Sequence, residues 1–222
     1  LLPHTWHPFF GRFGRLTPIQ AQTAAPIVHG HAVLAVAPTA SGKTEAVVAP
    51  LIERILASDS RRPGMRQAEQ AQSRAQLRAA ARHPSGRQPT SRRDAPPSER
   101  TLAAQEVAEV GGRGALRVIL LSPTRALCND LLRRLRRPVE RCRIRAQVKS
   151  GDSSGFKDKD PPELLITTPE SLDSMLCRRP KTLRTVRAVM IDELHLLADT
   201  ARGDQLQCLL ARLEKVAEGR VQ

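Results

Sequence analysis

The sequence predicts an α/β fold in which a mostly parallel β-sheet is flanked by helices. Short apolar runs alternate with longer segments whose apolar residues recur at helical spacing. Several of these runs are apolar throughout, which is typical of strands buried on both faces. A Gly/Ser-rich motif and an acidic motif directly follow two of the runs, and parallel sheets form their ligand sites at the carboxyl ends of strands.

The elements follow from local patterns in the sequence. Thr17 and Pro18 are a suitable N-cap and first helical residue, and Gly30 is a suitable end for the helix that they begin. The predicted strands are residues 32–37, 117–122, 144–151, 163–168 and 186–192. The predicted helices are residues 18–28, 43–57, 125–137, 170–177 and 204–217.

Residues 58–114 differ sharply in composition from the rest of the chain. They are rich in Arg, Gln, Ala, Pro, Ser and Gly and contain few large apolar side chains. Such a composition cannot bury enough apolar surface to form a core. We therefore predict one α/β domain, formed by residues 1–57 and 115–222, and a long, poorly ordered, basic, low-complexity insertion. The arginines of the insertion either contact nucleic-acid phosphates or belong to a solvated loop.

Charge and cysteine content restrict the possible classes of protein. The formal net charge is +14, with 36 Lys and Arg against 22 Asp and Glu. Such a balance attracts polyanions, although Arg-rich and Ala-rich usage also reflects a GC-biased genome. The four cysteines lack the spacing of a zinc site or a CxxC pair. Since no signal peptide or membrane-length apolar run is evident, we expect a cytoplasmic protein with no membrane partner.

A phosphate-binding pattern lies between the first predicted strand and the helix that follows it. The segment APTASGKT, residues 37–44, matches GxxxxGK[ST] with Ala37 in place of the first glycine. Gly42 lets backbone amides point at phosphate oxygens, Lys43 supplies a cation, and the Thr44 hydroxyl is a suitable Mg²⁺ ligand. The alternative is a plain glycine-containing turn. The predicted nucleotide-binding residues of this loop are Thr39, Ala40, Ser41, Gly42, Lys43 and Thr44.

An acidic pair ends the predicted strand at residues 186–192. Asp192 is placed to hold Mg²⁺ together with Thr44, and Glu193 is placed to orient or deprotonate an attacking water. His195 either relays the nucleotide state to a bound partner or is a packed histidine. The alternative for the pair is an ordinary acidic helix start. With the phosphate loop, these residues predict ATP hydrolysis in which Lys43, Asp192, Glu193 and His195 are the catalytic group.

The motifs and their order resemble those of superfamily 2 helicases of the DExH type. APTASGKT and DELH resemble motifs I and II, and LTPIQ resembles the adenine-recognising Q motif. This implies that Gln20 reads the base, with Thr17 and the aromatics upstream of it nearby. SPTRAL, SGD and TTPESL resemble family segments that contact the nucleic-acid backbone. This resemblance implies such contacts at Thr124, Arg125, Gly151, Thr168, Pro169 and Glu170.

Longer stretches resemble the large helicase-related (Lhr) family, over residues 1–57 and 115–222. The resemblance implies a RecA-like P-loop domain that is the first of two. The second RecA-like domain, which carries arginine fingers, is expected to be absent from this chain. ATP and Mg²⁺ are the implied cofactors, and DNA is favoured over RNA as the partner. The block at 58–114 is longer and more polar than is usual in that family.

The predicted function is therefore that of an ATP-dependent helicase or translocase motor domain, in a fragment that does not unwind nucleic acid alone. Two alternatives remain open from the residues. One is a P-loop ATPase subunit of a nuclease or restriction system. The other is a non-catalytic fragment that binds nucleic acid or nothing.

Overall fold

The structure is a computed structural model that describes residues 1–38, 40–59, 114–151 and 156–222. The chain divides into a first unit, Leu1–Leu56 with Arg113–Gln222, and a second unit, Ala57–Gly112. The predicted insertion at 58–114 and its poor order lie almost wholly outside the described residues. The β-sheet lies in the first unit.

A four-stranded parallel sheet forms the centre of this unit and confirms the predicted α/β class. Its strands are β1 (Val118–Leu121), β2 (Ala146–Lys149), β3 (Leu164–Thr167) and β4 (Ala188–Ile191), in the spatial order β2-β3-β1-β4. Leu121 of β1 is in register with the last residues of β3 and β4. The three strands therefore end at one edge of the sheet, where the motif residues follow them.

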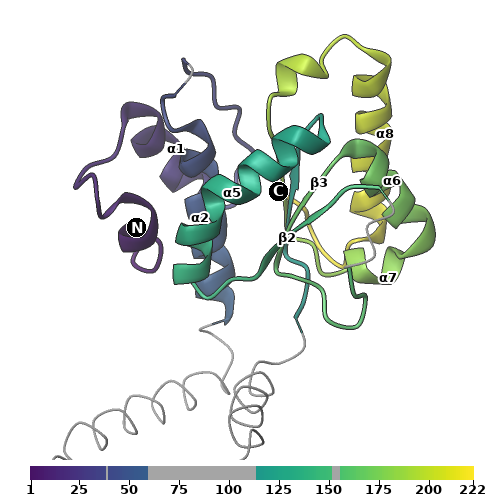
Figure 1. The fold of residues 1–222 in the computed structure, drawn as a ribbon, viewed down its shortest axis with the longest axis horizontal. Helices are drawn as coiled ribbons and strands as arrows, with labels where there is room; N and C mark the ends of the chain where they lie inside the picture. Colours follow the sequence, from purple (N-terminus) through teal and green to yellow (C-terminus); the bar gives the residue numbers. More distant parts are fainter. Residues whose placement is uncertain (39, 60–113, 152–155) are drawn as a thin grey trace, which may run out of the picture. The chain divides into compact units, whose positions relative to one another are not determined.

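Helices cover both faces of the sheet, as Figure 1 shows. On one face lie the π-helical turn η1 (Trp6–Phe10) and the helices α1 (Pro18–Val28), α2 (Lys43–Asp59) and α5 (Arg125–Arg141). On the other face lie α6 (Pro169–Arg178), α7 (Pro180–Leu183) and α8 (Ala201–Val216), with the short 3₁₀ turn η2 (Leu194–Leu196) after β4.

The side chains of β1 show why two separate cores form. Val118 and Leu120 pack in the core beneath α2 and α5, whereas Ile119 and Leu121 pack in the core beneath α6 and α8. All four are almost completely buried. Because successive side chains of a strand point to opposite faces, an unbroken apolar run supplies both cores at once.

The predicted strand at residues 32–37 is wrong. The segment forms no strand, and three of its apolar side chains are exposed: Val33 at 38%, Leu34 at 75% and Val36 at 81%. The backbone that pairs with β4 on the side away from β1 is that of Gln222. Its N–H donates to Arg187 O and its O accepts from Val189 N, both at 2.9 Å. An apolar run becomes a strand only where a partner backbone lies beside it, and local sequence does not specify that partner.

In the part of the chain that the structure describes, no helix is long and apolar enough to pass through a membrane.

Candidate nucleotide and nucleic-acid sites

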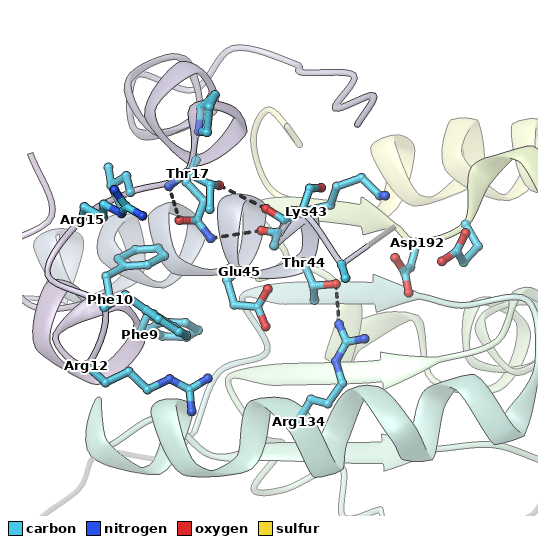
Figure 2. A pocket seen from close by; sticks show the side chains of 18 residues that line it. Phe9, Phe10, Arg12, Arg15, Thr17, Lys43, Thr44, Glu45, Arg134 and Asp192 are labelled. Atoms are coloured by element: carbon cyan, nitrogen blue, oxygen red, sulfur yellow. Dashed lines mark hydrogen bonds between the residues drawn. The ribbon is translucent and has the colours of Figure 1, made fainter. Parts of the chain in front are cut away.

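A cavity of about 760 Å³ lies beside the amino end of α2 and brings distant motifs together. Its wall comes from the N-terminal aromatics, the start of α1, the loop before α2, α5 and the end of β4 (Figure 2). Of the predicted residues, Thr17, Gln20, Ala40, Ser41, Gly42, Lys43, Thr44, Asp192 and Glu193 line this cavity. The phosphate-loop pattern and the acidic pair, some 150 residues apart, thus face the same space.

The loop before α2 has the backbone geometry of a tight turn. Gly42 has φ +82°, and a Cβ at this position would lie 2.4 Å from Gln20 Nε2. Glycine suits this backbone angle, and a Cβ would push the end of the Gln20 side chain away from Gly42 O. Ala40 also has a positive φ, of 60°, a strained value for a residue with a side chain. Thr39, also predicted to bind nucleotide, lies outside the described residues.

The Lys43 side chain folds back across this loop. Its Nζ donates to Ala37 O at 2.7 Å and to Pro38 O at 2.9 Å. These two carbonyls accept two of the three N–H donors of the ammonium group. To bind the Lys43 ammonium, a triphosphate would have to replace these two neutral carbonyls, which are weaker acceptors than phosphate oxygens.

The start of α1 is tied directly to the loop. Gln20 Oε1 accepts from Thr17 N at 2.9 Å, and Gln20 Nε2 lies 3.4 Å from Gly42 O, to which it donates. The Thr17 hydroxyl donates to Ser41 O at 3.1 Å. Thr17 and Gln20 also form the capping box of α1. These two side chains therefore fix α1, hold the loop and face the cavity at the same time.

Asp192 and Glu193 follow β4 at the carboxyl edge of the sheet. Asp192 N donates to Leu121 O at 2.8 Å, which extends the β1–β4 pairing to the acidic motif. Burial, with the nearby Glu193 carboxylate, raises the pKa of Asp192, while the positive charges of Arg134 and Lys43 oppose this rise. Glu193 has φ 49°, in the left-handed region. Such a backbone angle, two residues after the end of β4, is strained for a residue with a side chain.

His195 does not line the cavity. Its ring Nδ1 lies 3.3 Å from Glu193 Oε2, and its side chain is mostly exposed. The packed-histidine alternative is therefore wrong, since no core surrounds the ring. Whether it relays a nucleotide state stays a prediction.

Sequence reasoning missed one contributor to the cavity. Arg134 of α5 reaches across to α2, where its Nη2 donates to Thr44 Oγ1 at 2.6 Å. In the sequence this residue is one of several arginines in an amphipathic helix, and no local signal distinguishes it. The turn η1 also contributes, since its buried Phe9 and Phe10 line the cavity with Thr17 and Gln20. The resemblance to the Q motif implied that position for the upstream aromatics.

A second, smaller cavity of about 320 Å³ lies where β1, β2 and β3 end. Five of the six predicted nucleic-acid contacts line it: Thr124, Arg125, Gly151, Thr168 and Glu170. The sixth, Pro169, is buried as the first residue of α6 and does not line it. Gly151 has φ +66°, and a Cβ there would lie 2.6 Å from Arg125 Nη2.

The two threonines of the second cavity also cap helices. Thr124 Oγ1 accepts from Leu127 N at 3.3 Å at the start of α5, and Thr168 Oγ1 accepts from Ser171 N at 3.4 Å at the start of α6. Capping alone would account for both residues. Their joint position at one concave site, beside the Arg125 guanidinium, is what capping does not explain.

The profile of the DEAD/DEAH box helicases matches residues 17–221, nearly the whole chain. The chain belongs to the DEAD/DEAH box helicase family. Its predicted resemblance to Lhr helicases is confirmed by two curated relatives. "ATP-dependent helicase Lhr-Core protein 2" of Thermococcus barophilus is 30% identical over 94% of this chain. "Lhr helicase/uracil glycosylase" of Escherichia coli is 29% identical over 96% of it.

Solved structures agree with the assignment of this chain to the helicases. Mycobacterium smegmatis helicase Lhr, bound to ssDNA and AMP-PNP, has a TM-score of 0.63 and 26% identity over 98% of this chain. The DEAD-box helicase Mss116 shares the fold at a TM-score of 0.63 and 18% identity over 96% of this chain. The chain spans 21% and 12% of the two curated relatives and 24% and 35% of these two structures. It therefore corresponds to one motor domain of longer helicases.

Proposed function

We propose that this helicase domain binds MgATP in the larger cavity and couples its hydrolysis to nucleic acid bound at the smaller one. The observation that carries the proposal is that Gly42, Lys43 and Thr44 share one cavity with Asp192 and Glu193. A plain glycine turn or an acidic helix start would have no reason to face the other motif. We infer the domain bounds 1–57 and 115–222 for this motor.

The phosphates would be held by the loop and the helix that it begins. The amino end of α2, a 17-residue helix, offers unpaired amides and a partial positive charge to an anion. Lys43 would exchange its two carbonyl partners for phosphate oxygens. Glu193 would orient the attacking water, and charge at the transferred phosphoryl group would be neutralised by cations.

Magnesium fits the oxygen donors of this cavity. Among the described residues, no three His, Cys, Asp or Glu side chains form a group that could hold a metal ion. We therefore do not propose a site in which protein side chains alone surround the ion. The Thr44 hydroxyl and the Asp192 carboxylate are hard oxygen donors of the kind that Mg²⁺ prefers, with phosphates and waters supplying the rest. The ion would neutralise developing charge on the phosphates.

The base would lie against α1 and the N-terminal aromatics. Gln20 offers an amide with both donor and acceptor atoms, which suits the adenine edge. Phe13 is exposed and Arg12 lies over its ring at 4.4 Å, so this wall also has an aromatic face. Because Gln20 also contacts Gly42, base binding and loop conformation would be linked.

Nucleic acid would be held at the smaller cavity through its backbone. Arg125 supplies the charge, and α5 and α6 both begin at this site, where helix amino ends favour phosphate. Such contacts carry no base sequence and weaken with salt. We infer single-stranded DNA as the preferred partner, since the similar Lhr structure holds ssDNA and AMP-PNP.

We expect this 222-residue polypeptide alone to bind ATP but to hydrolyse it slowly and not to unwind DNA. In related motors, arginine fingers from a second domain contribute roughly 10³–10⁵ in rate. Full helicase activity would need that domain, and the curated relatives that this chain matches are several times longer.

Separate titrations with ATP and single-stranded DNA test the proposal. We expect Lys43→Ala to weaken ATP binding by about tenfold or more, the loss of one charge-assisted contact, while DNA binding stays unchanged. Arg125→Ala should show the reverse pattern. Equal background binding of ATP by both variants and by the unaltered chain would instead support a non-catalytic fragment.

A further inference from the structure

Arg134 holds a position in the larger cavity that the proposed reaction does not explain. It lies on α5, yet its guanidinium Nη2 donates to Thr44 Oγ1 at 2.6 Å across the gap between two helices. Figure 2 shows the side chain extending from α5 to the Thr44 hydroxyl. Arg134 and Asp192 line the same cavity.

Lys43 does not contact Thr44 in this way. Its ammonium is bonded to the loop carbonyls of Ala37 and Pro38. The Arg134 guanidinium is therefore the cation that is bonded to Thr44, one of the two oxygen donors proposed for magnesium, and it lines the same cavity as the other donor, Asp192.

An acidic partner of Arg134 lies one helical turn away. Asp130 Oδ2 lies 3.9 Å from Arg134 Nη1, on the same face of α5. The guanidinium thus lies between the cavity and a surface carboxylate. It could leave Thr44 without losing its ion pair, which keeps the cost of such a movement low.

We propose that Arg134 is a resident cation of the magnesium position and that binding of Mg²⁺ with nucleotide displaces it toward Asp130. The inference rests on the proposed function. Mg²⁺ binds oxygen ligands at about 2.0–2.1 Å and demands near-octahedral geometry. A guanidinium N–H that points at the same hydroxyl oxygen occupies one of its two lone pairs, and two cations at one position repel each other. Arg134 is thus a positioning residue that sets how much magnesium the site needs.

Arg134→Met and its matched control Arg133→Met test the proposal. Both changes remove one positive charge from α5, and both side chains pair with Asp130. Arg133 is 83% exposed, so it stands away from the cavity. Methionine keeps much of the apolar stem that packs along the helix. Binding of a fluorescent ATP analogue is measured at increasing Mg²⁺ concentration.

We expect the Mg²⁺ concentration for half-maximal nucleotide binding to fall roughly tenfold in Arg134→Met, the size of a hydrogen bond to a charged group. Arg133→Met should match the unaltered chain. Arg134→Gln keeps a polar group but removes the charge, and we expect the same fall in the Mg²⁺ concentration for half-maximal binding. It replaces Arg134→Met in the test if circular dichroism shows that Arg134→Met folds poorly.

Two results would overturn the displacement while leaving the proposed function intact. An unchanged midpoint in both Arg134 variants would mean that the guanidinium does not compete. A higher midpoint, or weaker nucleotide binding at saturating Mg²⁺, would make Arg134 a phosphate ligand. If the unaltered chain binds no analogue at any Mg²⁺ concentration, the proposed function itself fails, and this inference fails with it.

Discussion

At the scale of single residues, the larger cavity depends on groups that serve fold and ligand together. Gln20 caps α1, contacts the phosphate loop and faces the cavity. Gly42 is favoured by its backbone angle, and a Cβ there would meet the end of the Gln20 side chain. Motif patterns identified these residues because the backbone itself demands them. Arg134 was not identifiable, because its partner Thr44 lies 90 positions away and its neighbours are also arginines.

Gly42→Ala tests this double requirement. We expect it to lower stability by roughly 2–3 kcal/mol, because a left-handed backbone costs about 1–2 kcal/mol and the Cβ also meets Gln20 Nε2. ATP binding should be lost with it. Gly14→Ala is the matched control, since Gly14 has φ +67° but open space around it. Urea denaturation should find only the backbone cost there; equal losses at both positions would contradict the close contact.

Asp192→Asn tests how the buried Asp192 carboxylate affects the stability of the fold. The raised pKa means that the folded state binds this proton more tightly than the unfolded state does. Folding is therefore weakened as pH rises through the range above the ordinary value of 3.8, and the penalty is full once Asp192 is ionised. We expect Asn to raise Tm by about 1–3 °C at neutral pH, with no gain below that range. Melting curves from pH 3 to 8 would refute this if Asn were destabilising at neutral pH.

At the scale of elements, local signals predicted the helices more accurately than the strands. The capping box and Pro18 place the start of α1 where the sequence predicted it. The strands predicted at residues 117–122, 163–168 and 186–192 exist, although they are shorter than predicted. Each contributes side chains to the cores on both faces of the sheet. Residues 32–37 have the same composition but no paired edge. Strand formation depends on distant backbone, and composition does not contain that information.

The N-terminal segment is fixed to α2 by a buried carboxylate. Glu53 is 3% exposed and accepts hydrogen bonds from Thr5 N and Thr5 Oγ1, both at 3.0 Å, and from His4 N at 3.1 Å. No sequence pattern indicated this contact across 48 residues. It holds the segment that leads into η1, and so it supports the aromatic wall of the cavity.

Glu53→Ala should therefore destabilise the domain more than an ordinary surface change does. We expect a loss of roughly 2–4 kcal/mol in chemical denaturation, because buried N–H and O–H donors lose their acceptor. Glu140→Ala is the control: its exposed pair with Arg136 on α5 is worth about 0.5 kcal/mol or less. Similar losses in both variants would show that Glu53 does not anchor the segment.

At the scale of the whole molecule, charge and site geometry lead to the same expectation for nucleic acid. The net charge of +14 favours polyanions in general, and the smaller cavity concentrates an arginine and two helix starts at one point. Composition alone left nucleic-acid binding undecided. The order of the motifs predicted that Thr124, Arg125, Gly151 and Thr168 contact nucleic acid. How these residues are arranged in one cavity follows only from the fold.

Salt dependence of binding to single-stranded DNA measures this electrostatic component. We expect the logarithm of affinity to fall linearly with the logarithm of salt concentration, with a slope of about −0.7 per phosphate contact. Arg125→Ala should reduce the slope by about one such contact, whereas Arg133→Ala, outside the cavity, should change it less. Binding that does not respond to salt would contradict backbone recognition.

We have proposed that the phosphate loop and the acidic pair form one MgATP site. A crystal structure with Mg²⁺ and a non-hydrolysable ATP analogue would show whether they do. We expect the triphosphate around Gly42, Lys43 and Thr44, the base against Gln20, and the ion between Thr44 and Asp192. An analogue bound elsewhere on the domain, or an ion held without either of those two residues, would contradict the account.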